Sequence, residues 1–344
     1  MTFLLPVSAV CHIFAHEFTE LRFLPLAMSL ADPNPLLQQA AACLSDDRQL
    51  HGLLHECCCS VPLPSAPALA EVIELCRAVL FPGFFGDPHV SRQTLQRHMT
   101  QHIQRLHPLL AEQILSGLCF TKPKDDGRTV PDRSAAELAQ ELATRFVCRL
   151  PELRRTLATD VEASYRGDPA AESRAEIISC YPVIKAVTNY RIAHELLLLG
   201  VPLIPRIITE MAHSETGIDI HPAATIGSHF TIDHGTGVVI GATCIIGNNV
   251  KLYQGVTLGA KSFPLDEEGN PIKGIPRHPI LEDDVIVYSN ATVLGRITIG
   301  RGTVIGGNVW VTESTKPGQQ ILQGKKIKSQ LKEIIIKPED YGGL

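Results

Sequence analysis

The sequence has no excess of basic residues. Its 344 residues include 31 Lys and Arg against 36 Asp and Glu, which gives a formal net charge of −5 at pH 7. A protein that binds nucleic acid or an anionic membrane as its main partner needs surplus positive charge to neutralise phosphates. We therefore expect neither nucleic acid nor a membrane as a partner.

The sequence also lacks a long uninterrupted apolar run and a disulfide framework. No stretch approaches the roughly 18 apolar residues of a membrane span, and the apolar N-terminus has no basic start of the kind found in signal peptides. The ten cysteines follow no disulfide-scaffold spacing, which is typical of a reducing compartment. These absences predict a cytoplasmic protein.

A zinc site is also not expected from the cysteine pattern. His51 and His55 lie close to Cys57–Cys59, but their spacing matches no standard zinc finger. Helical surroundings favour core packing for these residues, so we expect no metal.

Length and pattern together predict two domains of the α+β class, because a single core rarely grows beyond about 250 residues. The expected parts are an apolar extension over residues 1–35, a helical domain over 36–216, a β domain over 217–318 and a tail over 319–344. Met28 is an alternative start to Met1, and in that case the apolar extension is not part of the protein.

Helical periodicity dominates the first two hundred residues. The clearest case starts at a capping box, Ser134–Glu137. Apolar residues then recur at three-to-four spacing, at Leu138, Leu142, Phe146, Leu150, Leu153, Leu157 and Val161. Pro151 is expected to kink or break this helix, and the polar segment 121–133 before it is expected to be a loop.

Two further helical stretches precede the β domain. One is expected over 176–199 with an interruption near Pro182, and a shorter one over 204–212. Gly200 and Gly217 stand where helix ends are expected.

Beyond Gly217 the apolar period becomes six. The repeated residues are Ile220, Ile226, Ile232, Val238, Cys244, Val250 and Val256, and then Leu281, Val287, Val293, Ile299, Ile305 and Val311. The two runs are out of phase by one residue, so the segment 259–279 must leave the repeat as a loop.

A period of six is typical of a triangular parallel coil. Each hexad supplies a short strand and a turn, the aliphatic residue points inward, and the coils stack at about 4.8 Å. An ordinary antiparallel domain would alternate every two residues, so the sequence predicts a parallel β-helix.

Two segments of the repeat domain carry an acid and a histidine nearly one coil apart. Asp219 and His234 are therefore predicted to lie on adjacent rungs, within hydrogen-bond reach. A carboxylate behind an imidazole fixes its tautomer and stabilises the imidazolium, which makes the histidine a general base. From the residues alone, such a pair is either catalytic or merely solvated on the outer face.

Four segments follow one another in an order that resembles the serine O-acetyltransferase family of hexapeptide-repeat acyltransferases. They are GIDIHPAATIGS at 217–228, IDHGTGVVIG at 232–241, VTLGAK at 256–261 and RHP at 277–279. The likeness spans 167–318 and includes Gly167–Pro169 and Tyr190–His194 in the helical region.

The resemblance implies a left-handed parallel β-helix with an extruded loop over 259–279, and a homotrimer, often paired into a hexamer. It also implies an enzyme that transfers the acetyl group of acetyl-CoA to L-serine, the first step of cysteine biosynthesis, with acetyl-CoA as co-substrate and no metal. Inhibition by cysteine, which can occupy the serine site, is expected on the same ground.

The resemblance further implies roles for individual residues. His234 is the general base, Asp219 orients it, and His278 lies beside the serine hydroxyl. Asp168 and Asp233 hold the ammonium of serine, and Arg277 holds its carboxylate, because a guanidinium binds a carboxylate through two parallel hydrogen bonds. Coenzyme A is expected near Ser289, Gly307, Gly259 and Lys261.

The chain departs from the family pattern in three places. Gly241-Ala-Thr243 replaces the family's Gly-Glu-Thr, and the loop 262–274 is of a longer form found in one subgroup. The family's tail ends in isoleucine and inserts into O-acetylserine sulfhydrylase, whereas this sequence ends at Leu344. The resemblance implies assembly with that enzyme, but the different last residue does not support it.

Three alternatives remain at this point. One is an O-acetyltransferase of the same fold that acts on a sugar, an antibiotic or another amino acid. Another is a zinc protein of the carbonic-anhydrase type, suggested by His229 and His234, although His221 is at the wrong distance to complete its ligand set. The last is a scaffold without activity, which the intact set of Asp219, His234, Arg277 and His278 disfavours.

Overall fold

The computed structural model describes residues 34–51, 53–55, 61–120 and 133–323. The predictions for 1–33, for Cys57–Cys59, for the loop at 121–132 and for the tail ending at Leu344 lie outside these residues. The chain separates into two units, Met1–Glu56 and Cys57–Leu344. In the first unit the described helices are α1 (Asn34–Leu44) and α2 (Asp47–Leu50).

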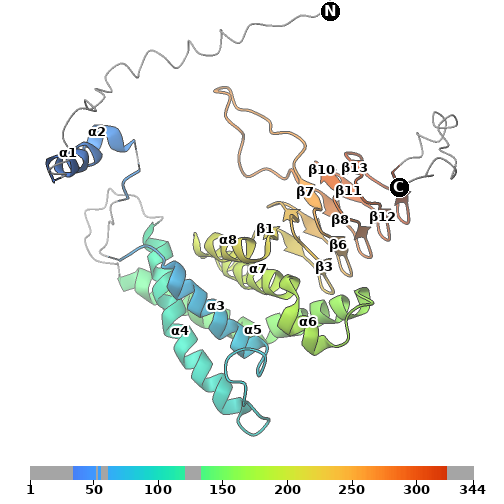
Figure 1. The fold of residues 1–344 in the computed structure, drawn as a ribbon, viewed down its shortest axis with the longest axis horizontal. Coiled ribbons are helices and arrows are strands. Elements are labelled where there is room, and N and C mark those ends of the chain that lie inside the picture. The colour runs from blue at the N-terminus through green and yellow to red at the C-terminus, as the bar shows by residue number, and fades with distance from the viewer. Residues whose placement is uncertain (1–33, 52, 56–60, 121–132, 324–344) are drawn as a thin grey trace, which may run out of the picture. The chain divides into compact units, whose positions relative to one another are not determined.

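The second unit begins with helices and ends with strands (Figure 1). Its helices are α3 (Ala66–Leu80), α4 (Leu95–Phe120), α5 (Arg133–Gly167), α6 (Arg174–Cys180), α7 (Pro182–Leu198) and α8 (Ile204–Thr216). The side chain of Ser173 caps α6 by accepting from the N–H of Glu176. Gly217 ends α8 in the left-handed conformation, at φ 69°, as the sequence predicts.

The predicted helical stretches are confirmed with one correction. The interruption near Pro182 separates α6 from α7. Pro151 is expected to kink or break its helix, and the break is wrong, because α5 continues through this residue; the kink stays a prediction. Leu150 and Leu153 on either side of Pro151 are buried in the core, and this burial offsets the single backbone hydrogen bond that proline removes.

Residues 219–321 form a triangular β-helix of parallel strands in three sheets, each named here by its lowest-numbered strand. The β1 sheet contains β1 (Asp219–Ile220), β4 (Val239–Ile240), β7 (Thr257–Gly259), β10 (Thr292–Leu294) and β13 (Trp310–Val311). The β2 sheet contains β2 (Thr225–Ile226), β5 (Ile245–Ile246), β8 (Ile280–Leu281) and β11 (Thr298–Ile299). The β3 sheet contains β3 (Thr231–Asp233), β6 (Lys251–Tyr253), β9 (Ile286–Val287), β12 (Val304–Ile305) and β14 (Gln320–Ile321).

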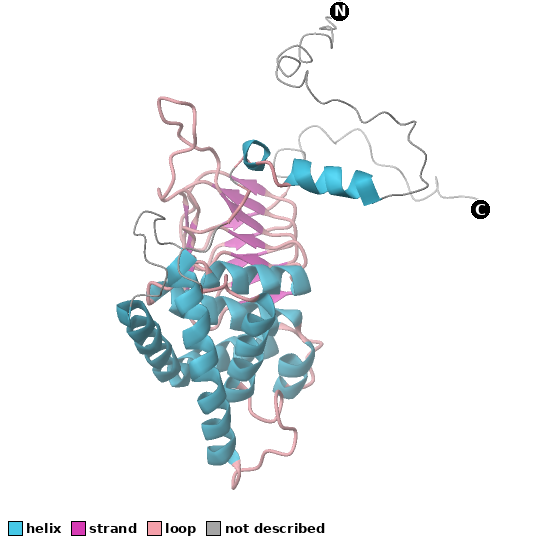
Figure 2. Ribbon diagram, turned by 90° about the vertical axis from the view of Figure 1, so that its left-hand side faces the viewer, coloured by secondary structure: helices cyan, strands magenta, loops and turns pink. Residues whose placement is uncertain are grey.

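Burial supports the predicted period of six, with one correction to the register. Ile220 pairs with Ile240 and Ile232 with Leu252, so the first coil has 20 residues (240 − 220) and the register slips by two residues after Ile232. All thirteen repeated apolar residues are buried, with exposed fractions of 8% or less, and they fill the interior of the coil. Asn249, Asn290 and Asn308 adopt positive φ angles at turns, where asparagine tolerates the left-handed conformation. Residues 260–279 leave the coil between β7 and β8, so the predicted extruded loop is also confirmed (Figure 2).

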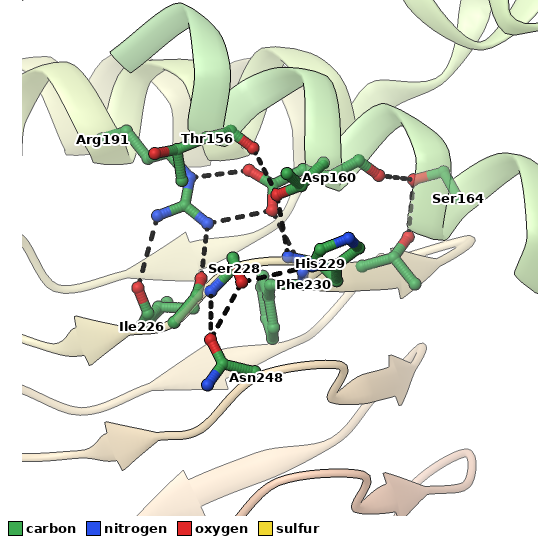
Figure 3. A network of polar contacts seen from close by, with 12 residues as sticks. Thr156, Asp160, Ser164, Arg191, Ile226, Ser228, His229, Phe230 and Asn248 are labelled. Atoms are coloured by element: carbon green, nitrogen blue, oxygen red, sulfur yellow. Dashed lines mark hydrogen bonds and ion pairs between the residues drawn. The ribbon is translucent and has the colours of Figure 1, made fainter. Parts of the chain in front are cut away.

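A buried ion pair joins the helices to the first coil of the β-helix (Figure 3). Arg191 on α7 donates to both carboxylate oxygens of Asp160 on α5, at 2.6 and 2.9 Å, and to the carbonyl oxygens of Ile226 and Gly227 at 3.3 and 2.8 Å. Asp160 also accepts from the N–H of Phe230 at 3.0 Å. The network fixes the end of α5, and thus the Gly167–Asp168 segment, against the coil.

Candidate active site

Three of the predicted site residues meet where the β3 sheet ends and the chain turns toward the β1 sheet. Asp233 is the last residue of β3, and His234 follows it at φ 57°, in the left-handed region that a non-glycine residue rarely adopts. Nε2 of His234 lies 3.8 Å from Oδ1 of Asp233, and the imidazole is 76% exposed. This turn presents His234 outward, open to a substrate, and is called the base corner below.

Asp168 lies beside the base corner, immediately after α5. Its carboxylate accepts from the hydroxyl of Tyr181 at 2.5 Å and from the N–H of Ala170 at 2.8 Å. The hydrogen bond from Tyr181 is the largest of the effects that lower the pKa of Asp168, and the nearby Lys251 and His234 add smaller contributions. Asp168 is therefore an anion held in place beside His234.

Lys251 joins Asp233 to the end of α5. Its Nζ lies 3.0 Å from Oδ2 of Asp233 and donates to the carbonyl oxygen of Gly167 at 2.6 Å. Asp168, Tyr181, Asp233 and Lys251 line a cavity of about 10 Å³, which is room for roughly one water molecule. This cavity is too small for an amino acid, so a substrate has to meet these groups from outside it.

Asp219 lies in β1, opposite Val239 of the next coil. Its carboxylate is within 4.8 Å of the potential ligand atoms of Glu210 and His213 on α8. In the described part of the chain no hydrogen bond joins Asp219 to His234, so the orienting role of Asp219 stays a prediction.

Arg277 and His278 lie at a different turn, where the β1 sheet passes to the β2 sheet. His278 is buried against Gly241, and a Cβ atom at Gly241 would stand 2.0 Å from the imidazole carbon Cδ2. Arg277 extends over the ring of Phe263 in the extruded loop, at 5.8 Å from its centroid. This turn is called the arginine corner below.

Thr243 holds the arginine corner together. Its hydroxyl oxygen accepts from the N–H of Arg277 at 2.9 Å and from the N–H of His278 at 3.1 Å. Nδ1 of His278 in turn accepts from the N–H of Thr243 at 3.1 Å. The neutral imidazole therefore carries its proton on Nε2, from which it can donate a hydrogen bond.

The charge state of the arginine corner follows from burial. Burial is the main cause that lowers the pKa of His278 to about 4, with Arg277 as a second cause. His278 is consequently neutral at pH 7. Nε of Arg277 is buried without a hydrogen-bond partner among the described residues, so this donor is unsatisfied within the chain.

The four predicted coenzyme residues fall at both corners. Ser289 and Gly307 occupy the same turn as His234 on later coils, because the strand register aligns these three positions. The two residues are close together, since a Cβ atom at Gly307 would lie 3.1 Å from the Ser289 carbonyl oxygen. Gly259 and Lys261 lie at the arginine corner, next to Gly295.

The histidines of the predicted zinc alternative do not form a cluster. Among the described residues, the one group of three potential ligand atoms within 4.8 Å of one another is Glu210, His213 and Asp219. His229 instead lies against the hydroxyl of Ser228, with Nδ1 at 3.2 Å from Oγ.

Sequence reasoning missed three residues of the two corners: Tyr181, Lys251 and Thr243. The proximity of Lys251 to Asp233 could have been predicted from the repeat. The strand register pairs Asp233 with Tyr253 on the next coil, and Lys251 lies two residues before Tyr253. Tyr181 gave no such signal, since its contact with Asp168 depends on how α6 follows α5.

Comparison with known proteins gives one consistent result. The plasmid serine acetyltransferase of Synechococcus elongatus is 51% identical over 264 residues, which are 77% of this chain and 83% of that protein. The serine acetyltransferase of Bacillus licheniformis is 44% identical over 184 residues, which are 51% of this chain and 81% of that protein. No family model matches.

Solved structures agree with the sequence relatives. Serine acetyltransferase 1 of Entamoeba histolytica in complex with L-cysteine has a TM-score of 0.63 and 36% identity, covering 73% of this chain and 86% of its own. The native form of that protein has a TM-score of 0.62 and 34% identity, covering 83% and 96%. Within the described residues, no helix is both long enough and apolar enough to cross a membrane.

Proposed function

This chain belongs to the serine acetyltransferase family of acyltransferases, and we propose that it transfers the acetyl group of acetyl-CoA to the hydroxyl of L-serine. The observation that carries the proposal is the base corner, where an exposed histidine stands beside two carboxylates. A base for the hydroxyl and anions for the ammonium are thus available side by side.

His234 is the general base of the proposed reaction. It removes the proton of the serine hydroxyl as the oxygen attacks the thioester carbonyl, and it returns that proton to the departing thiolate of coenzyme A. A general base of this kind contributes about 10²–10⁴-fold to the rate. Its exposed position at a turn allows both substrates to approach the imidazole.

The two corners fit the two charges of serine. Asp168 and Asp233 accept hydrogen bonds from the ammonium, and Arg277 binds the carboxylate with its fork of donors. His278, neutral and protonated on Nε2, donates a hydrogen bond near the reacting oxygen. A sugar acceptor would leave Arg277 without an anion, so an amino acid is the better fit.

We further propose that each site combines the base corner of one copy with the arginine corner of another, in a homotrimer. Within one chain these corners lie at opposite ends of the strands of the β1 sheet. One side of a coil is about six residues long at ~3.3 Å per residue, which is more than one serine molecule spans. The same sheet turns Val239 and Trp310 outward, with exposed fractions of 37% and 69%, which suits burial against a second copy. The trimer pairs base and arginine corners cyclically.

Mixed assemblies test this arrangement. His234→Ala and Arg277→Met chains, each inactive alone, are denatured together and refolded together. If the site is shared between copies, about a quarter of the sites contain both native corners, and activity returns to about that fraction. If both corners of a site came from one chain, the mixture would stay inactive.

Coenzyme A is proposed to run along the base corner past Ser289 and Gly307 and to contact Gly259 and Lys261 of the neighbouring copy. The thioester then lies at the end of the coenzyme that is next to His234. Cysteine, which carries the same ammonium and carboxylate as serine, is proposed to compete for the same corners.

The acceptor is tested by thiol release from acetyl-CoA with a panel of amino acids, sugars and amino alcohols. Serine should support the highest kcat/KM, and ethanolamine, which lacks the carboxylate, should be much poorer. A sugar or another amino acid with a higher kcat/KM than serine would overturn the proposed acceptor.

A further inference from the structure

Lys251 is the one charged side chain of the base corner to which the proposed reaction gives no task. It lies in β6, opposite Thr231 of β3, and its side chain is only 15% exposed. A lysine buried to this extent must keep its ammonium fully paired, because desolvation penalises the charge.

The ammonium of Lys251 is paired on three sides. It binds Oδ2 of Asp233 at 3.0 Å and the Gly167 carbonyl oxygen at 2.6 Å, and it lies 4.4 Å from the centroid of the Tyr253 ring. Burial works against the charged form, but Tyr253 and Asp233 raise the pKa of Lys251, so the ammonium persists.

The two carboxylate oxygens of Asp233 have different neighbours. Oδ2 faces Lys251, and Oδ1 faces Nε2 of His234 at 3.8 Å. Asp168 is held differently, because Tyr181 donates to its Oδ2 and the N–H of Ala170 donates to its Oδ1. Asp233 is therefore the carboxylate whose Oδ1 is left toward His234 once Oδ2 has met Lys251.

The charges of the corner also balance around one ligand. Asp168 and Asp233 together carry two negative charges, and Lys251 cancels one of them. The remaining negative charge matches a single incoming ammonium, whereas two uncompensated carboxylates that line one small cavity would repel each other.

We propose that Lys251 is a positioning residue of the acceptor site, which anchors Asp233 so that its free oxygen meets the substrate ammonium beside His234. The inference rests on the proposed function, since it assumes that the acceptor carries an ammonium. It assigns to Lys251 an effect on the amino acid substrate and none on coenzyme binding.

The test compares Lys251→Met, Lys251→Arg and a matched control, Lys185→Met, which removes an exposed lysine paired with Glu215 on the helices. In Lys251→Met the KM for serine should rise about tenfold or more, the scale of a lost hydrogen bond between charged groups. The KM for acetyl-CoA should stay at the wild-type value, and the midpoint of thermal unfolding should fall modestly, because Asp233, only 18% exposed, loses its charged partner. Lys251→Arg should recover most of the serine affinity, and Lys185→Met should match the wild type.

Two results would overturn the inference. One is an unchanged serine KM in Lys251→Met. The other is a parallel change in both KM values and in the unfolding midpoint, which would show that Lys251 only ties α5 to the coil through Gly167. The comparison uses whichever amino acid the wild type accepts best, so a failure of serine as substrate is distinguished from a failure of the role assigned to Lys251.

Discussion

Thr243 offers the sharpest test of how the arginine corner is built, because valine removes its hydroxyl while keeping nearly the same shape. The hydroxyl oxygen accepts the N–H groups of Arg277 and His278, at 2.9 and 3.1 Å, and lies 2.9 Å from Nδ1 of His278. In Thr243→Val both N–H groups lose their acceptor, at a cost of about 1–3 kcal/mol each.

Loss of these hydrogen bonds should displace Arg277 and His278 without unfolding the β-helix. Arg277 and His278 stand at the foot of the extruded loop and are not among the aliphatic residues that fill the interior of the coil. A displacement of about 1 Å in substrate-positioning residues costs about 10²-fold in rate. We therefore expect kcat/KM for serine to fall by roughly 10- to 100-fold in Thr243→Val.

The assay is thiol release under varied serine concentration at saturating acetyl-CoA, with thermal unfolding measured in parallel. Thr243→Ser keeps the hydroxyl and should stay within about threefold of the wild type, since no hydrogen bond is lost. Wild-type kcat/KM in Thr243→Val would refute the reasoning, and so would an equal loss in Thr243→Ser.

Three further predictions concern charge. Arg191→Met leaves Asp160 buried and unpaired, so the protein should lose about 3–5 kcal/mol of stability, seen as a lower unfolding midpoint; an unchanged midpoint would contradict this. The pKa of His278 is lowered from 6.5 to about 4 in the folded protein. Between these pH values the unfolded chain binds a proton at this residue and the folded chain does not, so the free energy of unfolding should decrease as the pH drops from 6.5 toward 4. His278→Gln should flatten that fall in unfolding midpoints measured between pH 7 and 5, and an equally steep fall would speak against it. Arg277→Lys keeps the charge but loses the fork, so serine KM should rise while acetyl-CoA KM holds; the inverse pattern would assign Arg277 to the coenzyme.

The β-helix could be predicted from the sequence because its interior imposes a rule on every coil. The inside of a triangular coil has room for one aliphatic side chain per strand, so Ile232, Leu252 and Val287 recur in register. The register break also located the loop correctly. Pro151 misled the prediction, since burial of the surrounding helix outweighs one missing hydrogen bond.

The candidate site could be predicted only in part. The spacing of the repeats paired His234 with Asp219, and the family resemblance added Asp233 and Asp168, which the structure places beside His234. Outward side chains obey no periodic rule, so the contacts of Tyr181 with Asp168 and of Thr243 with His278 depend on chain paths that a repeat pattern does not contain. The separation of the base corner from the arginine corner likewise required the sheet topology.

The central claim, that His234 is the general base for serine, is tested most directly by kcat of His234→Ala at saturating serine and acetyl-CoA. The matched control is His229→Ala, because His229 is also exposed at a turn and shares the φ angle of 57°. The account predicts a loss of about 10²–10⁴-fold in His234→Ala, with unchanged assembly by sedimentation, and activity near the wild type in His229→Ala. Near-normal kcat in a correctly assembled His234→Ala enzyme would contradict it.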